Sequence, residues 1–104
     1  MDTVQNRPGY VYIIKAENGL YKIGKTRNII QRLGSLFTMS PVKLTVLHTI
    51  KTNDAYHCER ELHENYREYR SHGEWFRLPN ETVQHLLSYA EIFCREDRYL
   101  EGKP

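Results

Sequence analysis

Two short β-favouring runs joined by an Asn-Gly pair constrain this chain more than any other feature. Residues 10–14 are aromatic and β-branched, and residues 20–24 follow after Asn18-Gly19. Aromatic and β-branched side chains favour strands, and Asn-Gly is the strongest short-range signal for a tight hairpin turn. The pattern predicts an antiparallel strand pair that begins close to the N-terminus.

A helix and a third strand are expected after this hairpin. Thr26 or Asn28 can cap the helix, and Ser40-Pro41 ends it. Its apolar positions recur at helical spacing and are Ile29, Ile30, Leu33 and Phe37. Residues 42–50 contain Leu44, Val46, Leu47 and Ile50 and are predicted to form the third strand.

Two more helices are predicted in the second half of the chain. Asn53 or Asp54 caps the first of them, whose buried stripe consists of Ala55, Cys58, Leu62, Tyr66 and Tyr69. Residues 74–78 form a short extended piece, and Asn80 is expected to cap the last helix. This order of elements predicts an α+β domain with a mainly antiparallel sheet flanked by helices.

Length and composition indicate one domain with one core, because the chain has 104 residues. We expect a flexible arm at residues 1–8, a single domain at 9–96 and a frayed tail at 97–104. No apolar run reaches the length of a membrane span, and no signal-peptide pattern is present, so a cytoplasmic protein is expected. Cys58 and Cys94 fall on apolar helical positions and are predicted to be buried, reduced thiols.

Positive charge is concentrated in the first half of the chain. Residues 1–51 hold eight Lys and Arg against two acidic residues, whereas the remainder holds seven against eleven. A basic half attracts phosphates. Lysines that keep strand edges soluble are the alternative explanation.

Five sequence pieces carry a resemblance to a known family. They are GYVYI at residues 9–13, GLYKIGKT at 19–26, Arg32, the run from Ala55 through Glu59 to His63, and GEWF at 73–76. This set resembles the GIY-YIG nuclease superfamily, in its T5orf172 branch. The resemblance implies a small three-stranded antiparallel sheet flanked by helices, one divalent metal ion, and hydrolysis of a DNA phosphodiester.

The resemblance implies a catalytic role for Tyr12 and Lys22. The Tyr12 phenol would orient or deprotonate the attacking water, and it needs a nearby cation because a free phenol has a pKa near ~10. Lys22 stands where the superfamily usually has tyrosine, and its ammonium would stabilise a phenolate. The alternatives are a tyrosine that packs on the sheet and a solvent-facing lysine.

The resemblance also implies catalytic roles for Arg32 and Glu59. The Arg32 guanidinium would neutralise charge that develops on the phosphate. Glu59 would bind a single Mg²⁺ or Mn²⁺ ion, which acts as a Lewis acid on the phosphate. A surface arginine and a solvated helix glutamate are the alternatives.

Lys25 and His63 are the candidate phosphate-binding residues. An exposed loop lysine and a packing histidine are equally compatible with the sequence. Trp75 and Phe76 are expected to close the core rather than stack on a base. Glu74 is expected to be exposed, and its role is open.

The sequence therefore predicts a metal-dependent DNA endonuclease or nickase. A DNA-binding module of the same fold that does not cut is the alternative, because Leu36 replaces the His or Tyr often found there and no late Asn is matched. A small protein-interaction domain is a third possibility. DNA is the expected partner, with no membrane and no small-molecule substrate, and the oligomeric state is open.

Overall fold

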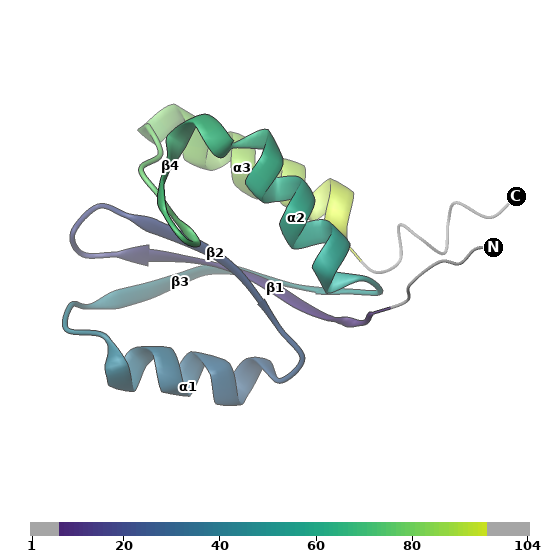
Figure 1. The fold of residues 1–104 in the computed structure, drawn as a ribbon, viewed down its shortest axis with the longest axis horizontal. Coiled ribbons are helices and arrows are strands. Elements are labelled where there is room, and N and C mark those ends of the chain that lie inside the picture. The colour runs from purple at the N-terminus through teal and green to yellow at the C-terminus, as the bar shows by residue number, and fades with distance from the viewer. Residues whose placement is uncertain (1–6, 96–104) are drawn as a thin grey trace, which may run out of the picture.

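The computed structural model describes residues 7–95 (Figure 1). Five strands form one antiparallel sheet in the order β3-β1-β2-β5-β4. They are β1 (Gly9–Ala16), β2 (Tyr21–Thr26), β3 (Leu44–Thr52), β4 (Arg70–His72) and β5 (Trp75–Phe76). The α+β class is confirmed. The prediction of three strands is wrong, because the short β4–β5 hairpin pairs with the first two residues of β2. The predicted tail at 97–104 and most of the predicted arm lie outside the described residues.

The central hairpin is built as its sequence predicts. The Asn18 side chain accepts a hydrogen bond from the Leu20 amide at 3.1 Å, and the Gly19 amide donates to the Ala16 carbonyl at 3.0 Å. This turn sets the register, which places Tyr12 opposite Gly24. Because alternate side chains point to opposite faces, this register decides which face each side chain of the hairpin joins.

Three α-helices and one short 3-10 helix flank the sheet. They are α1 (Ile29–Met39), α2 (Ala55–Asn65), η1 (Arg67–Tyr69) and α3 (Asn80–Cys94). Asn28 caps α1 and Asp54 caps α2, each through its side-chain oxygen. The predicted Asn80 cap is wrong, since Asn80 is the first residue of α3 and Pro79 occupies the capping position. The Pro79 carbonyl accepts the amides of Thr82 and Val83 instead.

The two faces of the sheet are covered unequally. Helices α2 and α3 lie on one face and α1 lies on the other (Figure 1). The main core fills the first side; its fully buried members include Val11, Ile13, Ile23, Cys58, Leu62, Phe76, Leu86 and Cys94. The prediction that Cys58 and Cys94 are buried and unlinked is confirmed. No described helix is long and apolar enough to cross a membrane.

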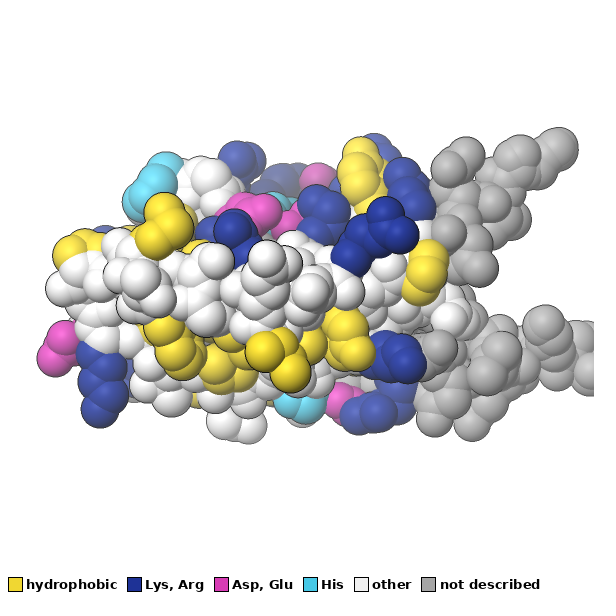
Figure 2. Space-filling model, turned by 90° about the horizontal axis from the view of Figure 1, so that it is seen from below, with side chains coloured by type: hydrophobic (Ala, Val, Ile, Leu, Met, Phe, Trp, Pro, Cys, Tyr) yellow, Lys and Arg dark blue, Asp and Glu magenta, His cyan; other side chains and the backbone are white. Residues whose placement is uncertain are grey.

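Helix α1 buries none of its residues. Ile30 is 81% exposed, Met39 79% and Phe37 48%. Figure 2 shows the face that carries α1, where hydrophobic side chains form a broken band. The fold is therefore held mainly by the layer between the sheet and the α2–α3 pair.

This asymmetry predicts where truncation destabilises the domain. Leu62→Ala removes a fully buried side chain from the main core, and we expect the free energy of unfolding to fall by about 2–5 kcal/mol. Met39→Ala, in exposed α1, is the matched control and should change it by less than about 0.5 kcal/mol. Chemical denaturation measures both. A similar loss in the two variants would contradict the described core.

Candidate functional site

The Tyr12 phenol lies across Gly24 on the neighbouring strand. A Cβ atom placed on Gly24 would lie 2.4 Å from Tyr12 Oη and 2.5 Å from Cζ, so the ring fills the space that a side chain would need. Arg32 Nε, from the first turn of α1, donates a hydrogen bond to Tyr12 Oη at 3.3 Å. Tyr12 is fully buried, and the exposed Arg32 is its hydrogen-bond partner at the surface.

The electrostatic surroundings keep Tyr12 in its neutral form. Burial raises the pKa of the phenol, and the hydrogen bond and positive charge of Arg32 oppose this only in part. The negative charges of Glu74 and Glu59 raise the pKa further. A hydroxyl in this state can orient a water molecule, but it needs an additional cation before it can remove a proton.

Lys22 lies on the same sheet face but does not pair with Tyr12. The register places it opposite Ile14, and its ammonium lies 3.0 Å from Glu74 Oε1 and 5.2 Å from the centre of the Trp75 ring. The cation that bonds the phenol is therefore Arg32. Glu74 is half-buried and ion-paired, which corrects the expectation that it is exposed.

Glu59 projects from α2 towards β2 and is only 8% exposed. Its Oε1 accepts a hydrogen bond from Lys25 Nζ at 3.3 Å. Its Oε2 is buried and accepts no hydrogen bond from any donor in residues 7–95. Burial first, and then contact with the Glu74 carboxyl and its charge, raise the pKa of Glu59 from 4.5 to about 7, against the opposing effect of Lys25.

Glu74 is held in the opposite protonation state. Partial burial acts to raise its pKa, but the hydrogen bond from Lys22 and the contact with Glu59 outweigh that effect, so the pKa of Glu74 lies below 4.5. Two neighbouring carboxyl groups with pKa values pushed apart share their negative charge unequally. At neutral pH Glu74 is therefore ionised, whereas Glu59, with a pKa of about 7, is ionised only in part.

His63 joins α2 to the strand that carries Gly24. Its Nε2 lies 2.8 Å from the Ile23 carbonyl oxygen, which can only accept, so Nε2 carries the proton. The ring packs edge-on against Phe76, with centres 5.0 Å apart, and its Nε2 is 4.0 Å from Glu59 Oε2. Burial lowers the pKa of His63 more than the Ile23 bond raises it, so the side chain is neutral near pH 7.

These groups approach the free edge of β2 from its two faces. Strand β5 pairs only with Tyr21 and Lys22, so within residues 7–95 β2 has no strand neighbour on that side from Gly24 onwards. Tyr12 and Arg32 reach this edge from the α1 side, whereas Glu59 and Lys25 meet on the α2 side.

The donor set is small but suited to a hard divalent ion. No three His, Cys, Asp or Glu side chains within residues 7–95 are grouped to hold a metal. Mg²⁺ keeps several of its waters and takes one or two carboxylates. The unpartnered Oε2 of Glu59 and the adjacent Glu74 carboxyl fit that requirement.

Sequence reasoning missed two contributions to this site. The pairing of Glu74 with Lys22 follows from the β2–β5 register, which joins two segments that lie far apart in the sequence, although the GEWF motif did mark Glu74. The space that Gly24 leaves for the phenol follows from the hairpin register, which the Asn-Gly turn implies.

Gly24→Ala should displace the Tyr12 ring. The added methyl group would overlap the phenol, and overpacking of this kind costs about 1–3 kcal/mol of stability. Gly34→Ala is the control, because nothing lies within 4 Å of its Cβ position in α1; it should stabilise the chain by about 0.4–1 kcal/mol. Denaturation curves and the Tyr12 ring signals in NMR spectra report both effects. An unmoved Tyr12 signal in Gly24→Ala would disprove the contact.

Glu59→Gln should remove one component of the pH dependence of stability. With a pKa of about 7 when folded and 4.5 when free, Glu59 makes the folded chain bind more protons than the unfolded chain between these values. The wild-type free energy of unfolding must then fall, relative to Glu59→Gln, as pH rises from about 4.5 to about 7. Denaturation in EDTA across pH 4–8 measures the difference, and a constant difference would refute the raised pKa.

Comparison with known proteins gives one match. A family model, the T5orf172 domain, matches residues 9–91. The search of curated proteins and the search of solved structures gave no significant match. The matched segment contains β1 to β5 and most of α3, so it includes every residue of the candidate site. This chain belongs to the T5orf172 domain family.

Proposed function

We propose that this domain is a GIY-YIG-type, metal-dependent DNA endonuclease or nickase. The observation that carries the proposal is the buried Glu59 carboxyl group, which shares a hydrogen bond with the Glu74 carboxyl and has one oxygen that no N–H or O–H donor in residues 7–95 reaches. A buried carboxylate oxygen without a donor is costly, and a bound cation would remove that cost. The negative charges of Glu59 and Glu74 raise the pKa of Tyr12, so the three groups are close enough to act in a single site.

Each charged group has a chemically plausible part in hydrolysis. Glu59, with Glu74 beside it, would hold Mg²⁺ or Mn²⁺, which supplies Lewis-acid stabilisation of the phosphate and the leaving oxygen. Arg32 would neutralise negative charge on the phosphate through its planar fork. Tyr12 would orient the attacking water through its phenol oxygen.

The remaining predicted residues would bind and position the substrate. Lys25 would exchange its contact with Glu59 for a phosphate oxygen. Lys22 would keep Glu74 charged and in place. His63, which is neutral and bonded to Ile23, would fix α2 on the strand, and a contact of its ring with phosphate stays a prediction.

Access to Tyr12 would require movement of Arg32. The phenol is fully buried and bonded to the guanidinium, and α1, which carries Arg32, buries none of its residues. An incoming phosphate would attract the guanidinium away from the phenol and expose the oxygen. If Arg32 instead stays bonded to the phenol, Tyr12 remains inaccessible, and this would favour a second candidate function, a DNA-binding module that does not cut.

A plasmid assay separates these functions. We expect wild-type protein to nick supercoiled plasmid with Mg²⁺ or Mn²⁺ and not with EDTA, and Glu59→Gln to reduce the rate by about 100-fold or more. Glu64→Gln is the matched control, since Glu64 lies on the same helix, is exposed and pairs with Arg67. Its rate should equal that of wild type.

The remaining outcomes assign the alternatives. Intact plasmid together with a salt-sensitive gel shift would establish the non-cutting module. Absence of both nicking and binding at low salt would remove DNA as the partner and leave a protein-interaction role. Equal loss of activity in Glu59→Gln and Glu64→Gln would argue against Glu59 as the metal ligand.

A further inference from the structure

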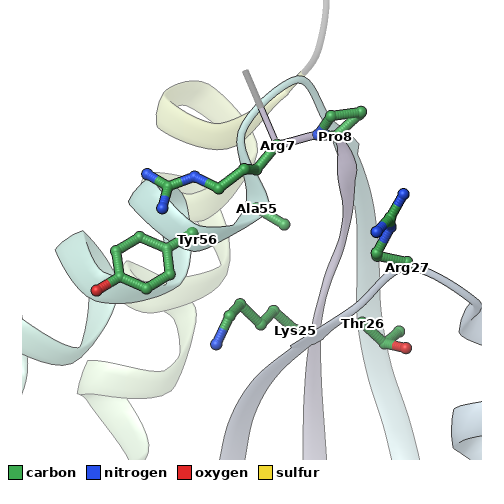
Figure 3. A pocket seen from close by; sticks show the side chains of 7 residues that line it. All are labelled: Arg7, Pro8, Lys25, Thr26, Arg27, Ala55 and Tyr56. Carbon is green, nitrogen blue, oxygen red and sulfur yellow. The ribbon is translucent and has the colours of Figure 1, made fainter. Parts of the chain in front are cut away.

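A surface cavity lies beside the candidate site and shares Lys25 with it. An open cavity of about 410 Å³ is bordered by the start of β1, the end of β2 and the first turn of α2 (Figure 3). Three cations border it: Arg7, Lys25 and Arg27. None of the lining residues within 7–95 is acidic, although Asp54 and Glu59 pair with Arg7 and Lys25 nearby. Its volume is that of a small-ligand pocket, roughly 300–1,000 Å³.

The cavity has a fixed framework. The Arg7 carbonyl accepts a hydrogen bond from the Ala55 amide at 2.8 Å. Gly9 packs so closely that a Cβ atom would lie 2.8 Å from the Thr26 carbonyl oxygen and 3.2 Å from Ala55 Cβ. Residues 7–9 are thereby held against β2 and α2, and Arg7 is held at the rim.

An aromatic ring lies among the cations. Tyr56 is 43% exposed, with the Arg7 guanidinium 4.1 Å and the Lys25 ammonium 5.5 Å from its centre. In Figure 3 the ring and Arg27 lie on opposite sides of the cavity. Arg27 has no acidic partner among residues 7–95, whereas Arg7 lies 3.6 Å from Asp54. Cations with an aromatic face recur where proteins bind single nucleic-acid strands, because they contact phosphates and stack on bases.

Lys25 connects the cavity to the candidate centre. Its side chain lines the cavity, and its ammonium is hydrogen-bonded to Glu59. A strand whose phosphate lies at Glu59 would therefore pass directly into the cavity with its next nucleotide. Inorganic phosphate would use the cations but leave Tyr56 and Pro8 without a function.

We propose that this cavity is a subsite for one nucleotide that flanks the phosphate held at Glu59. Arg7 and Arg27 contact its phosphate, Lys25 lies between this phosphate and the one at Glu59, and the base packs against the Tyr56 ring. This inference rests on the proposed DNA-handling function and adds a binding position that the cleavage chemistry does not require.

Binding measured in EDTA tests the subsite without reference to cutting. Fluorescence anisotropy is recorded with a labelled single-stranded 12-mer and with a 12-mer of the same sugars and phosphates that carries no bases. We expect Arg27→Ala and Tyr56→Ala each to weaken binding of the normal 12-mer by about 5- to 100-fold. Arg27→Ala should also lower the dependence of binding on salt by about one phosphate contact.

Two substitutions elsewhere serve as matched controls. Lys43→Ala removes an exposed cation that lies just before β3 and does not line the cavity. Phe37→Ala removes an aromatic side chain of α1 whose exposure is similar to that of Tyr56. Both should bind the 12-mer as wild type does. On the base-free 12-mer, Tyr56→Ala should match wild type, because no base is left to stack.

The outcomes separate this inference from the proposed function. Wild-type binding with unchanged affinity in Arg27→Ala and Tyr56→Ala would overturn the subsite and leave the nuclease proposal intact. A free deoxynucleoside monophosphate that competes as strongly as the 12-mer would also overturn it, because the cavity would then be a pocket for free nucleotides. Failure of wild type to bind any DNA would instead remove the proposed function, and the subsite with it.

Discussion

The register of the β1–β2 hairpin determines the candidate site. Because Tyr12 stands opposite Gly24, the phenol can lie across the neighbouring strand and meet Arg32 from α1. A slip of one residue would turn Tyr12 towards the α2–α3 core and turn Ile13 out of it. The Asn-Gly turn resists that slip, because it fixes which residues of β1 and β2 stand opposite each other, so the turn that builds the hairpin also places the phenol.

Charge in the site is arranged in alternating pairs around one strand edge. Lys22 holds Glu74, Lys25 holds one oxygen of Glu59, and Arg32 holds Tyr12. Each pair is partly buried, where charges interact more strongly than in water and lose part of their hydration. The other oxygen of Glu59 is left without a donor in the described part of the chain. The negative charge of Glu59 is therefore unfavourable in the free domain, as is common at sites that a ligand completes.

Local sequence patterns were sufficient to predict the strands, the turn and the helices, but not which side chains the strand register brings together. The strand-favouring runs, the hairpin turn and the helix caps are local; the runs and the turn were predicted, and Asn28 and Asp54 were each one of two predicted caps. The partner of Lys22 was not, since Glu74 reaches it only through the two-residue β5 strand, too short to show a period. Asn80 was misassigned because Pro79 already supplies the fixed backbone geometry that begins α3. Periodicity also does not show which of the candidate residues contact a substrate.

Helix α1 packs only lightly on the sheet, so it can move without loss of the main core. The helix carries Arg32, yet it contributes no buried residue to the core. Segments with few buried contacts open at low free-energy cost. Rearrangement over the phenol can therefore proceed as a local fluctuation, while the sheet and the α2–α3 layer keep Glu59 fixed. A domain of this size can therefore hold the acidic Glu59 in place while the basic Arg32 changes its position over the phenol.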